Sequence, residues 1–151
     1  MKSKILAAVV AAVTLAGVSM ETMAQAKPDV LVAQRQAAMK LIAKYFAPMG
    51  AMMKGAAPYN ADIVARNAGY VETLSKMPWD GFDPSTSGEK SKTKADAYKE
   101  MDKFKAAATN FETEAAKLAA AARAKDEGAV KMAFGAVAKT CGACHDAYRE
   151  K

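Results

Sequence analysis

The sequence predicts an all-α protein, folded as an antiparallel up-down-up-down four-helix bundle. Hydrophobic residues make up 52% of the 151-residue chain but aromatic residues only 7%, because alanine, the strongest helix former, supplies much of the apolar total. Apolar residues recur at alternating steps of three and four in four segments, which Pro, Gly and Asn separate. Helices joined by short connections lie antiparallel, which favours a bundle. A dimeric coiled coil would need an uninterrupted seam.

Residues 1–26 have the pattern of a cleaved secretory signal peptide. A start with two lysines precedes an apolar run over 5–18, and small residues at 24–26 form a cleavage site. The apolar run is shorter than the roughly 18 to 20 residues that span a bilayer. We therefore expect export to the periplasm, no membrane span in the mature chain, and one domain over 27–151.

The first two helices are expected over residues 29–49 and 60–77. Gly and Pro residues break the pattern between them, and Asn60 can cap the second helix. The inward face of the first helix is Leu31, Arg35, Ala38, Ile42, Phe46 and Met49. The expected seam of the second is Ile63, Asn67, Tyr70, Leu74 and Met77.

A loop over residues 78–91, rich in Pro and Gly, connects the two halves of the chain. Trp79 and Phe82 lie within it, and we expect both to fold back onto the core, because exposing them would forfeit a large apolar burial.

The third and fourth helices are expected over residues 93–124 and 126–149. Asp126 can cap the fourth helix. The third helix has the most regular seam of the chain, consisting of Ala97, Met101, Phe104, Ala108, Phe111, Ala115, Leu118 and Ala122. In the fourth, Val130, Phe134, Val137, Cys141, Cys144 and Tyr148 continue the same rhythm, which makes both cysteines inward residues.

The net charge of +6 does not indicate a nucleic-acid site. The lysines between residues 90 and 105 alternate with Asp96, Glu100 and Asp102, as on a solvated helix face. A mild positive charge would instead steer the protein towards acidic partners.

The pentapeptide Cys141-Gly142-Ala143-Cys144-His145 is the attachment signature of a c-type haem. Residues three apart lie on one face of a helix, so both thiols can reach vinyl groups on the same porphyrin edge. The adjacent His145 then points its imidazole at the iron, for which histidine is a common proximal ligand. The sequence therefore predicts one covalently attached haem c per chain.

Three other interpretations of this motif are weaker. A Cys141–Cys144 disulfide would have to form inside a helix, and a thioredoxin-like centre would need a βαβ setting. A zinc site would need further ligands, and the chain has only these two cysteines and one histidine. A chance match would have to place the single His directly after the single Cys pair.

The mature sequence resembles the class II cytochromes c, which include cytochrome c′. The resemblance rests on residues 141–149, on Arg35-Gln36, on Lys54-Gly55 followed by Pro58-Tyr59, and on Pro78-Trp79 with Phe82. It implies a four-helix bundle with the haem between the helices and His145 as proximal ligand.

The resemblance also implies roles for four other residues. Arg35 matches an arginine that pairs with a haem propionate, and its inward position fits, because an unpaired buried charge is costly. Arg149 matches a basic residue beside the proximal face. Trp79 and Phe82 match aromatic residues at the haem edge. Ordinary core packing would also explain these two aromatic residues, and a structural salt bridge would also explain Arg35.

Met39 lies one helical turn after Arg35 and matches the distal position over the iron. In cytochrome c′ an apolar or aromatic residue at that position does not bind the iron, which stays five-coordinate and open to nitric oxide or carbon monoxide. In low-spin relatives of the family, a methionine there is the sixth ligand. A thioether ligand suits electron transfer, whereas an unbound Met39 would be an apolar filler, and the sequence allows both.

Two functions follow from this choice. The first hypothesis is a periplasmic one-electron carrier, ligated by His145 and Met39, that serves acidic redox partner proteins. The alternative is a five-coordinate haem protein that sequesters or senses NO or CO. An enzyme is not expected, because no second histidine is present for acid–base work. A homodimer through the first two helices is expected by analogy, with Tyr45, Met52, Met53 and Tyr70 supplying apolar surface.

Overall fold

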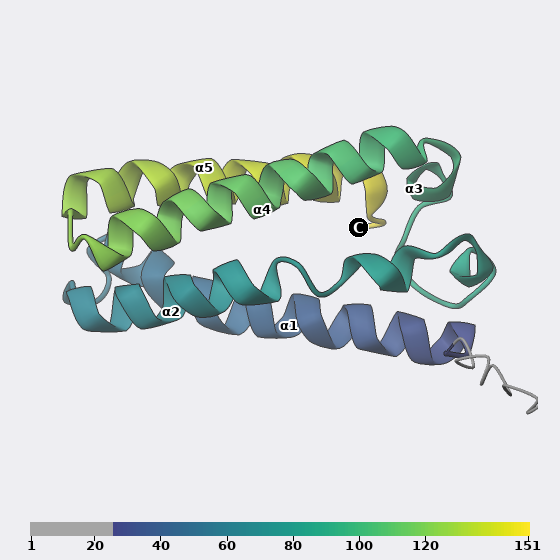
Figure 1. Cartoon of the computed structure of the whole chain (residues 1–151), viewed down its shortest axis with the longest axis horizontal. Coiled ribbons are helices and arrows are strands. Elements are labelled where there is room, and N and C mark those ends of the chain that lie inside the picture. Colours follow the sequence, from purple (N-terminus) through teal and green to yellow (C-terminus); the bar gives the residue numbers. More distant parts are fainter. Residues whose placement is uncertain (1–25) are drawn as a thin grey trace, which may run out of the picture.

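The structure, a computed structural model, describes residues 26–151 and shows a bundle of four long antiparallel helices (Figure 1). The long helices are α1 (Pro28–Met53), α2 (Ala61–Leu74), α4 (Met101–Arg123) and α5 (Glu127–Tyr148). In Figure 1 the pair α1 and α2 lies below the pair α4 and α5. The predicted all-α bundle is confirmed. The predicted signal peptide falls almost wholly outside the described residues.

The connections explain why neighbouring helices are antiparallel. Gly55, with a φ of 71°, turns the chain after α1, and the Asn60 side chain accepts from the backbone N–H groups of Asp62 and Ile63 to cap α2. Asp126 caps α5 in the same way by accepting from the Ala129 N–H. Both predicted caps are therefore present. No helix within residues 26–151 is long and apolar enough to cross a bilayer.

Between α2 and α4 the structure differs from the prediction. The expected loop contains two 3₁₀ turns, η1 (Trp79–Phe82) and η2 (Pro84–Thr86), and the expected third helix is broken. Glu100 has a φ of −113° and a ψ of 45°, which separates the one-turn helix α3 (Asp96–Lys99) from α4. This break turns the chain from the end of the bundle into the long axis of α4 (Figure 1).

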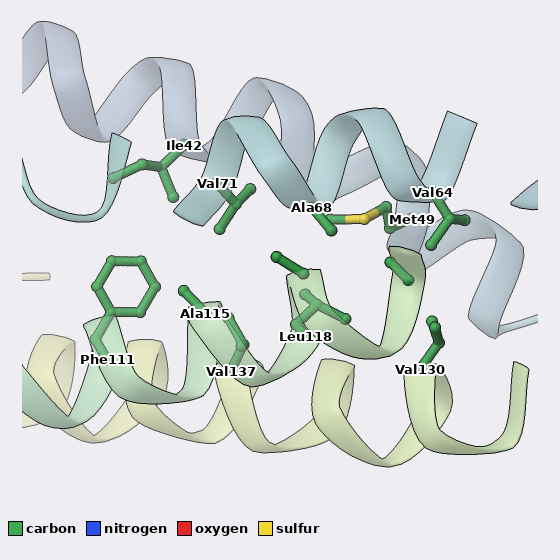
Figure 2. Close-up of a cluster of buried hydrophobic side chains, with 12 residues drawn as sticks. Ile42, Met49, Val64, Ala68, Val71, Phe111, Ala115, Leu118, Val130 and Val137 are labelled. Carbon is green, nitrogen blue, oxygen red and sulfur yellow. The ribbon is translucent and has the colours of Figure 1, made fainter. Parts of the chain in front are cut away.

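Apolar side chains from all four long helices form the core (Figure 2). Its fully buried members include Met49, Val64, Leu118 and Val130, one from each helix. Farther along the bundle, the rings of Phe46 and Phe134 stack with centroids 4.2 Å apart and join α1 to α5.

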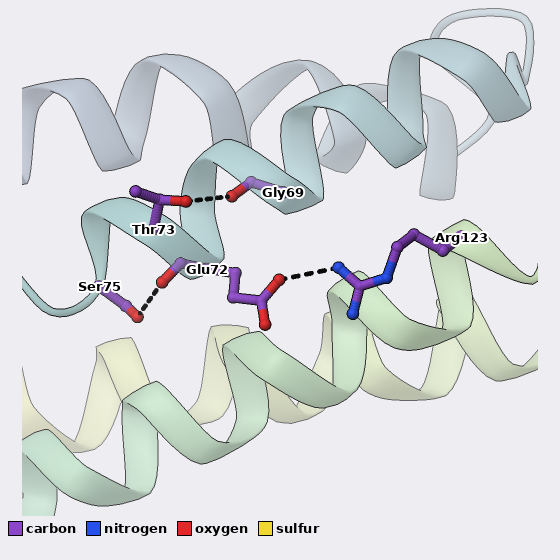
Figure 3. A network of polar contacts seen from close by, with 5 residues as sticks. All are labelled: Gly69, Glu72, Thr73, Ser75 and Arg123. Carbon is purple, nitrogen blue, oxygen red and sulfur yellow. Dashed lines mark hydrogen bonds and ion pairs between the residues drawn. The ribbon is translucent and has the colours of Figure 1, made fainter.

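The predicted seam of α2 was partly wrong. Tyr70 is 45% exposed. Met77 lies beyond the end of α2 at Leu74 and is 56% exposed. Asn67 of the predicted seam is buried, and Val64, Ala68 and Val71 form the rest of the buried side. The outer side of α2 carries polar contacts, including an ion pair from Arg123 of α4 to Glu72 at 2.9 Å (Figure 3).

Candidate haem-attachment site

The Cys-x-x-Cys-His pentapeptide lies within the last two turns of α5, near the end marked C in Figure 1. Cys141 and Cys144 are half-buried and carry free thiols, so no disulfide joins them. Their spacing of three residues places them on one face of α5, as the sequence predicted. His145 follows directly and is more exposed than either cysteine.

The electrostatic setting of these side chains keeps all three uncharged near neutral pH. Burial raises the pKa of the Cys141 and Cys144 thiols. Burial also lowers the pKa of His145, and the positive charge of Arg149 lowers it further. A neutral imidazole has a free nitrogen lone pair, the form that binds a metal ion.

Arg35 reaches the same end of the bundle from α1 and is only 3% exposed. Its Nη1 donates to the Gly81 carbonyl, to Thr86 Oγ1 at 2.9 Å and to the Tyr98 hydroxyl at 3.0 Å. Its Nη2 donates to Ser91 Oγ at 3.0 Å and to Thr93 Oγ1 at 3.1 Å. Every acceptor is a neutral oxygen, and within residues 26–151 no carboxylate forms an ion pair with Arg35.

Two buried polar groups at this end are therefore incompletely compensated, one for its charge and the other for its hydrogen bond. Arg35 carries a buried charge without a counter-charge, and Trp79 Nε1 is the one buried side-chain N or O atom of the described chain without any hydrogen-bond partner. Such groups are costly unless an acceptor or an anion compensates them. A haem fits this requirement, because its two propionates are anionic acceptors.

Aromatic rings pack together beside these groups. Trp79 and Phe82, both half-buried, contact Phe104 of α4 with ring centroids 6.0 and 4.6 Å away, and Tyr148 of α5 meets Phe104 at 5.3 Å. The Arg35 guanidinium lies 4.4 Å from the centroid of the Phe82 ring. The loop aromatics thus fold back onto the bundle, as expected, and give a flat porphyrin an apolar setting.

The stacked rings of Phe46 and Phe134 fix the register of α1 against α5. Met39 precedes Phe46 by seven residues, and Cys141 follows Phe134 by seven residues, so each lies about 10 Å from the stack along its helix. Because the two helices are antiparallel, Met39 and Cys141 lie at the same level of the bundle. Met39 is half-buried and packs against the core cluster.

Sequence reasoning missed the residues that hold Arg35. Thr86, Ser91, Thr93 and Tyr98 come from the segment between α2 and α4, where no periodicity indicates an inward side. Phe104 was placed on the inner seam by its spacing, but nothing in the sequence assigned it to the site.

Comparison with known proteins identifies the family of this chain. The sequence pattern of the family described as Cytochrome C′ matches residues 30–149, nearly the whole described chain. The chain belongs to the cytochrome c′ family. Cytochrome c′ of Alcaligenes xylosoxydans xylosoxydans is 40% identical over 126 residues, which cover 83% of this chain and 98% of that protein. Cytochrome c-556 of Agrobacterium tumefaciens is 33% identical over 117 residues, covering 78% and 92%.

Solved structures of this family share the fold. Cytochrome c prime from Shewanella frigidimarina has a TM-score of 0.81 and 35% identity, covering 84% of this chain and 99% of that one. A nitric oxide complex of an engineered variant of cytochrome c prime from Alcaligenes xylosoxidans has a TM-score of 0.78 and 39% identity, covering 84% and 98%. The predicted family and the predicted haem c cofactor are thereby confirmed.

Proposed function

We propose that this chain is a gas-binding haem protein of the cytochrome c′ type, whose iron is held by His145 and stays open to nitric oxide on the side of Met39. The observation that supports this most is the similarity, at 39 to 40% identity over most of both chains, to cytochromes c prime solved as nitric oxide complexes. This proposal favours the alternative of the two sequence hypotheses over the electron carrier.

Different residues of this chain would bind different parts of the cofactor. Cys141 and Cys144 would tether it through thioether bonds, and the neutral His145 would supply the proximal nitrogen. Arg35 and Trp79 Nε1 would receive the propionates, because the buried Arg35 has no anionic partner and the buried Trp79 N–H has no hydrogen-bond acceptor. When bound, the haem supplies an iron centre that a diatomic gas can ligate.

Met39 decides between this function and one-electron transfer. Its level along α1, the same as that of Cys141, supports a position on the other side of the haem from His145, where its thioether would either cover the distal face or ligate the iron. Methionine is also a flexible apolar filler, so an open site under Met39 needs no rearrangement of the bundle. A sixth ligand would close the iron to gases and support the electron carrier.

The optical spectrum of the reduced protein with and without carbon monoxide tests the proposal. We expect broad high-spin bands that shift with carbon monoxide, and the same spin state in Met39→Leu. Met132→Leu is the matched control, because Met132 lies on the outside of α5 and is 75% exposed. A sharp low-spin spectrum that does not shift with carbon monoxide would establish the electron carrier instead, if it becomes high-spin in Met39→Leu and not in Met132→Leu.

We also propose that the protein acts in the periplasm after removal of residues 1–26, and that it forms a homodimer through α1 and α2. Tyr45 and Tyr70 support the second point: their rings lie 4.6 Å apart across the two helices, and Tyr70 is exposed. Aromatic side chains are enriched in protein–protein interfaces.

A further inference from the structure

The end of α5 is fastened to the segment before α3 by a pair of backbone hydrogen bonds. The Lys94 N–H donates to the Tyr148 carbonyl at 2.9 Å, and the Glu150 N–H donates to the Lys92 carbonyl at 2.8 Å. Together they form an isolated antiparallel bridge between Thr93 and Arg149. We call residues 92–94 with 148–150 the strap.

Lysine side chains reinforce the strap on both sides. Lys94 Nζ donates to the Asp146 carbonyl at 2.8 Å, and Lys92 Nζ donates to the Lys151 carbonyl at 3.0 Å. The carbonyl of Asp146 belongs to the last turn of α5, where carbonyls have no partner within the helix. The strap thus satisfies the end of α5 as well as holding the residues beyond it.

The bridge sets the directions of two side chains. Its hydrogen bonds flank the Thr93–Arg149 pair instead of joining it, so this is a non-hydrogen-bonded pair whose side chains leave the backbone on the same side, close together. The Thr93 hydroxyl on that side accepts from Arg35 Nη2 at 3.1 Å. The Arg149 side chain therefore leaves on the side of the Arg35 site.

Arg149 is also joined to His145. Its N–H donates to the His145 carbonyl at 3.0 Å. Arg149 is the first residue after α5 and has an extended backbone, with φ at −125° and ψ at 133°. Helix ends fray, so the helix alone does not hold a residue at this position.

We propose that the strap is a positioning device, which holds Arg149 beside His145 and fixes both to the Arg35 site through Thr93. This inference rests on the proposed function in one respect, that His145 is the iron ligand. Groups just outside the ligands tune a metal centre through charge and orientation. A positive charge held beside His145 favours the reduced iron, so a loosened strap should lower the reduction potential.

Glu150→Pro removes one backbone hydrogen bond of the strap. Proline has no N–H to donate to the Lys92 carbonyl, and the backbone of Arg149 already has the conformation that a residue before proline prefers. Glu150→Ala is the matched control, because it loses the same carboxylate but keeps the N–H. Arg149→Gln removes the charge that the strap is proposed to hold.

The test is the reduction potential of the haem-loaded protein and its amide hydrogen exchange. We expect Glu150→Pro to have a lower potential than Glu150→Ala and faster exchange at the Lys94 amide. In the Arg149→Gln background, we expect the two variants to have equal potentials, whereas the difference in exchange at the Lys94 amide should persist. Equal potentials in the two variants, or an equal shift in the Arg149→Gln background, would overturn the proposal, since either would leave the strap without an effect through Arg149.

Carbon monoxide binding separates this inference from the proposed function. If the unaltered protein fails to bind carbon monoxide, the proposed function fails, and the potential and exchange comparisons still decide the role of the strap. If all variants bind carbon monoxide but show no difference in potential, only the strap proposal fails.

Discussion

The two ends of the bundle are built from different kinds of contact. At the end we call the closed end, Met49, Val64, Leu118 and Val130 fill the space between the four helices and are fully buried. At the other, the haem end, the inner side carries Arg35 and Trp79 together with the haem-attachment motif. Charged groups at the closed end stay on the surface, as in the Lys125–Asp62 pair at 2.8 Å.

This difference indicates which end of the bundle depends on the cofactor for its stability. The closed end has an apolar core that needs no further group, because its helices exclude water by themselves. The haem end buries a guanidinium without a counter-charge and an indole N–H without an acceptor, which is costly until an anionic group arrives. We therefore expect the two ends to respond differently to loss of haem.

The largest effect is expected from Cys141→Ala combined with Cys144→Ala. With no thiols, the protein cannot retain haem covalently, so haem staining after denaturing electrophoresis should be lost completely. Hydrogen exchange should become faster in the segment 79–98 and at the end of α5, while peptides around Leu118 keep the protection of the haem-loaded protein. An equal rise at both ends would contradict the comparison.

The closed end can be weakened on its own with Leu118→Ala. Leu118 is fully buried, and removing such a side chain leaves a cavity that typically costs about 2 to 5 kcal/mol of stability. Urea unfolding of the haem-loaded protein measures this loss. Met132→Ala, at a position 75% exposed on α5, should change stability by less than about 0.5 kcal/mol.

The two ends also differ in how far the sequence predicts them. Every predicted inward residue of α4, from Phe104 to Ala122, is buried, because a long helix with a strict three-four rhythm leaves one choice of face. The shorter α2 offered two overlapping faces, and the predicted one, with Tyr70, was partly wrong. Val64, Ala68 and Val71 form the more compact apolar stripe, and packing against α4 selects it.

At the haem end, the parts carried by regular helices were predictable, and so was the folding of Trp79 and Phe82 onto the core. The motif at 141–145 is local in sequence, and the inward position of Arg35 follows from the period of α1. Its acceptors could not be predicted, because Thr86, Ser91 and Tyr98 lie in a segment whose path is set by contacts distant in sequence. The break at Glu100 escaped prediction for the same reason: the residues around it have ordinary helix-forming character.

The contact between this irregular segment and α1 is tested by Gly81→Ala. A Cβ at Gly81 would lie 2.6 Å from the Cβ of Arg35 and 2.7 Å from the Leu31 carbonyl oxygen, and neither atom can move without its helix. The η1 turn would have to shift away from α1, and its carbonyl would lose its bond from Arg35. Overpacking of this kind costs about 1 to 3 kcal/mol.

The matched control for Gly81→Ala is Gly88→Ala, in the same segment, where a new Cβ meets no atom within 4 Å. Urea unfolding should separate the two variants, with the midpoint lowered only in Gly81→Ala. The loss should be larger without haem, because the proposed contact with the propionates would hold Arg35 in place independently of the Gly81 carbonyl. If both substitutions cost the same, the haem end is held by the general compactness of the loop, and the close approach of η1 to α1 has no special part in it.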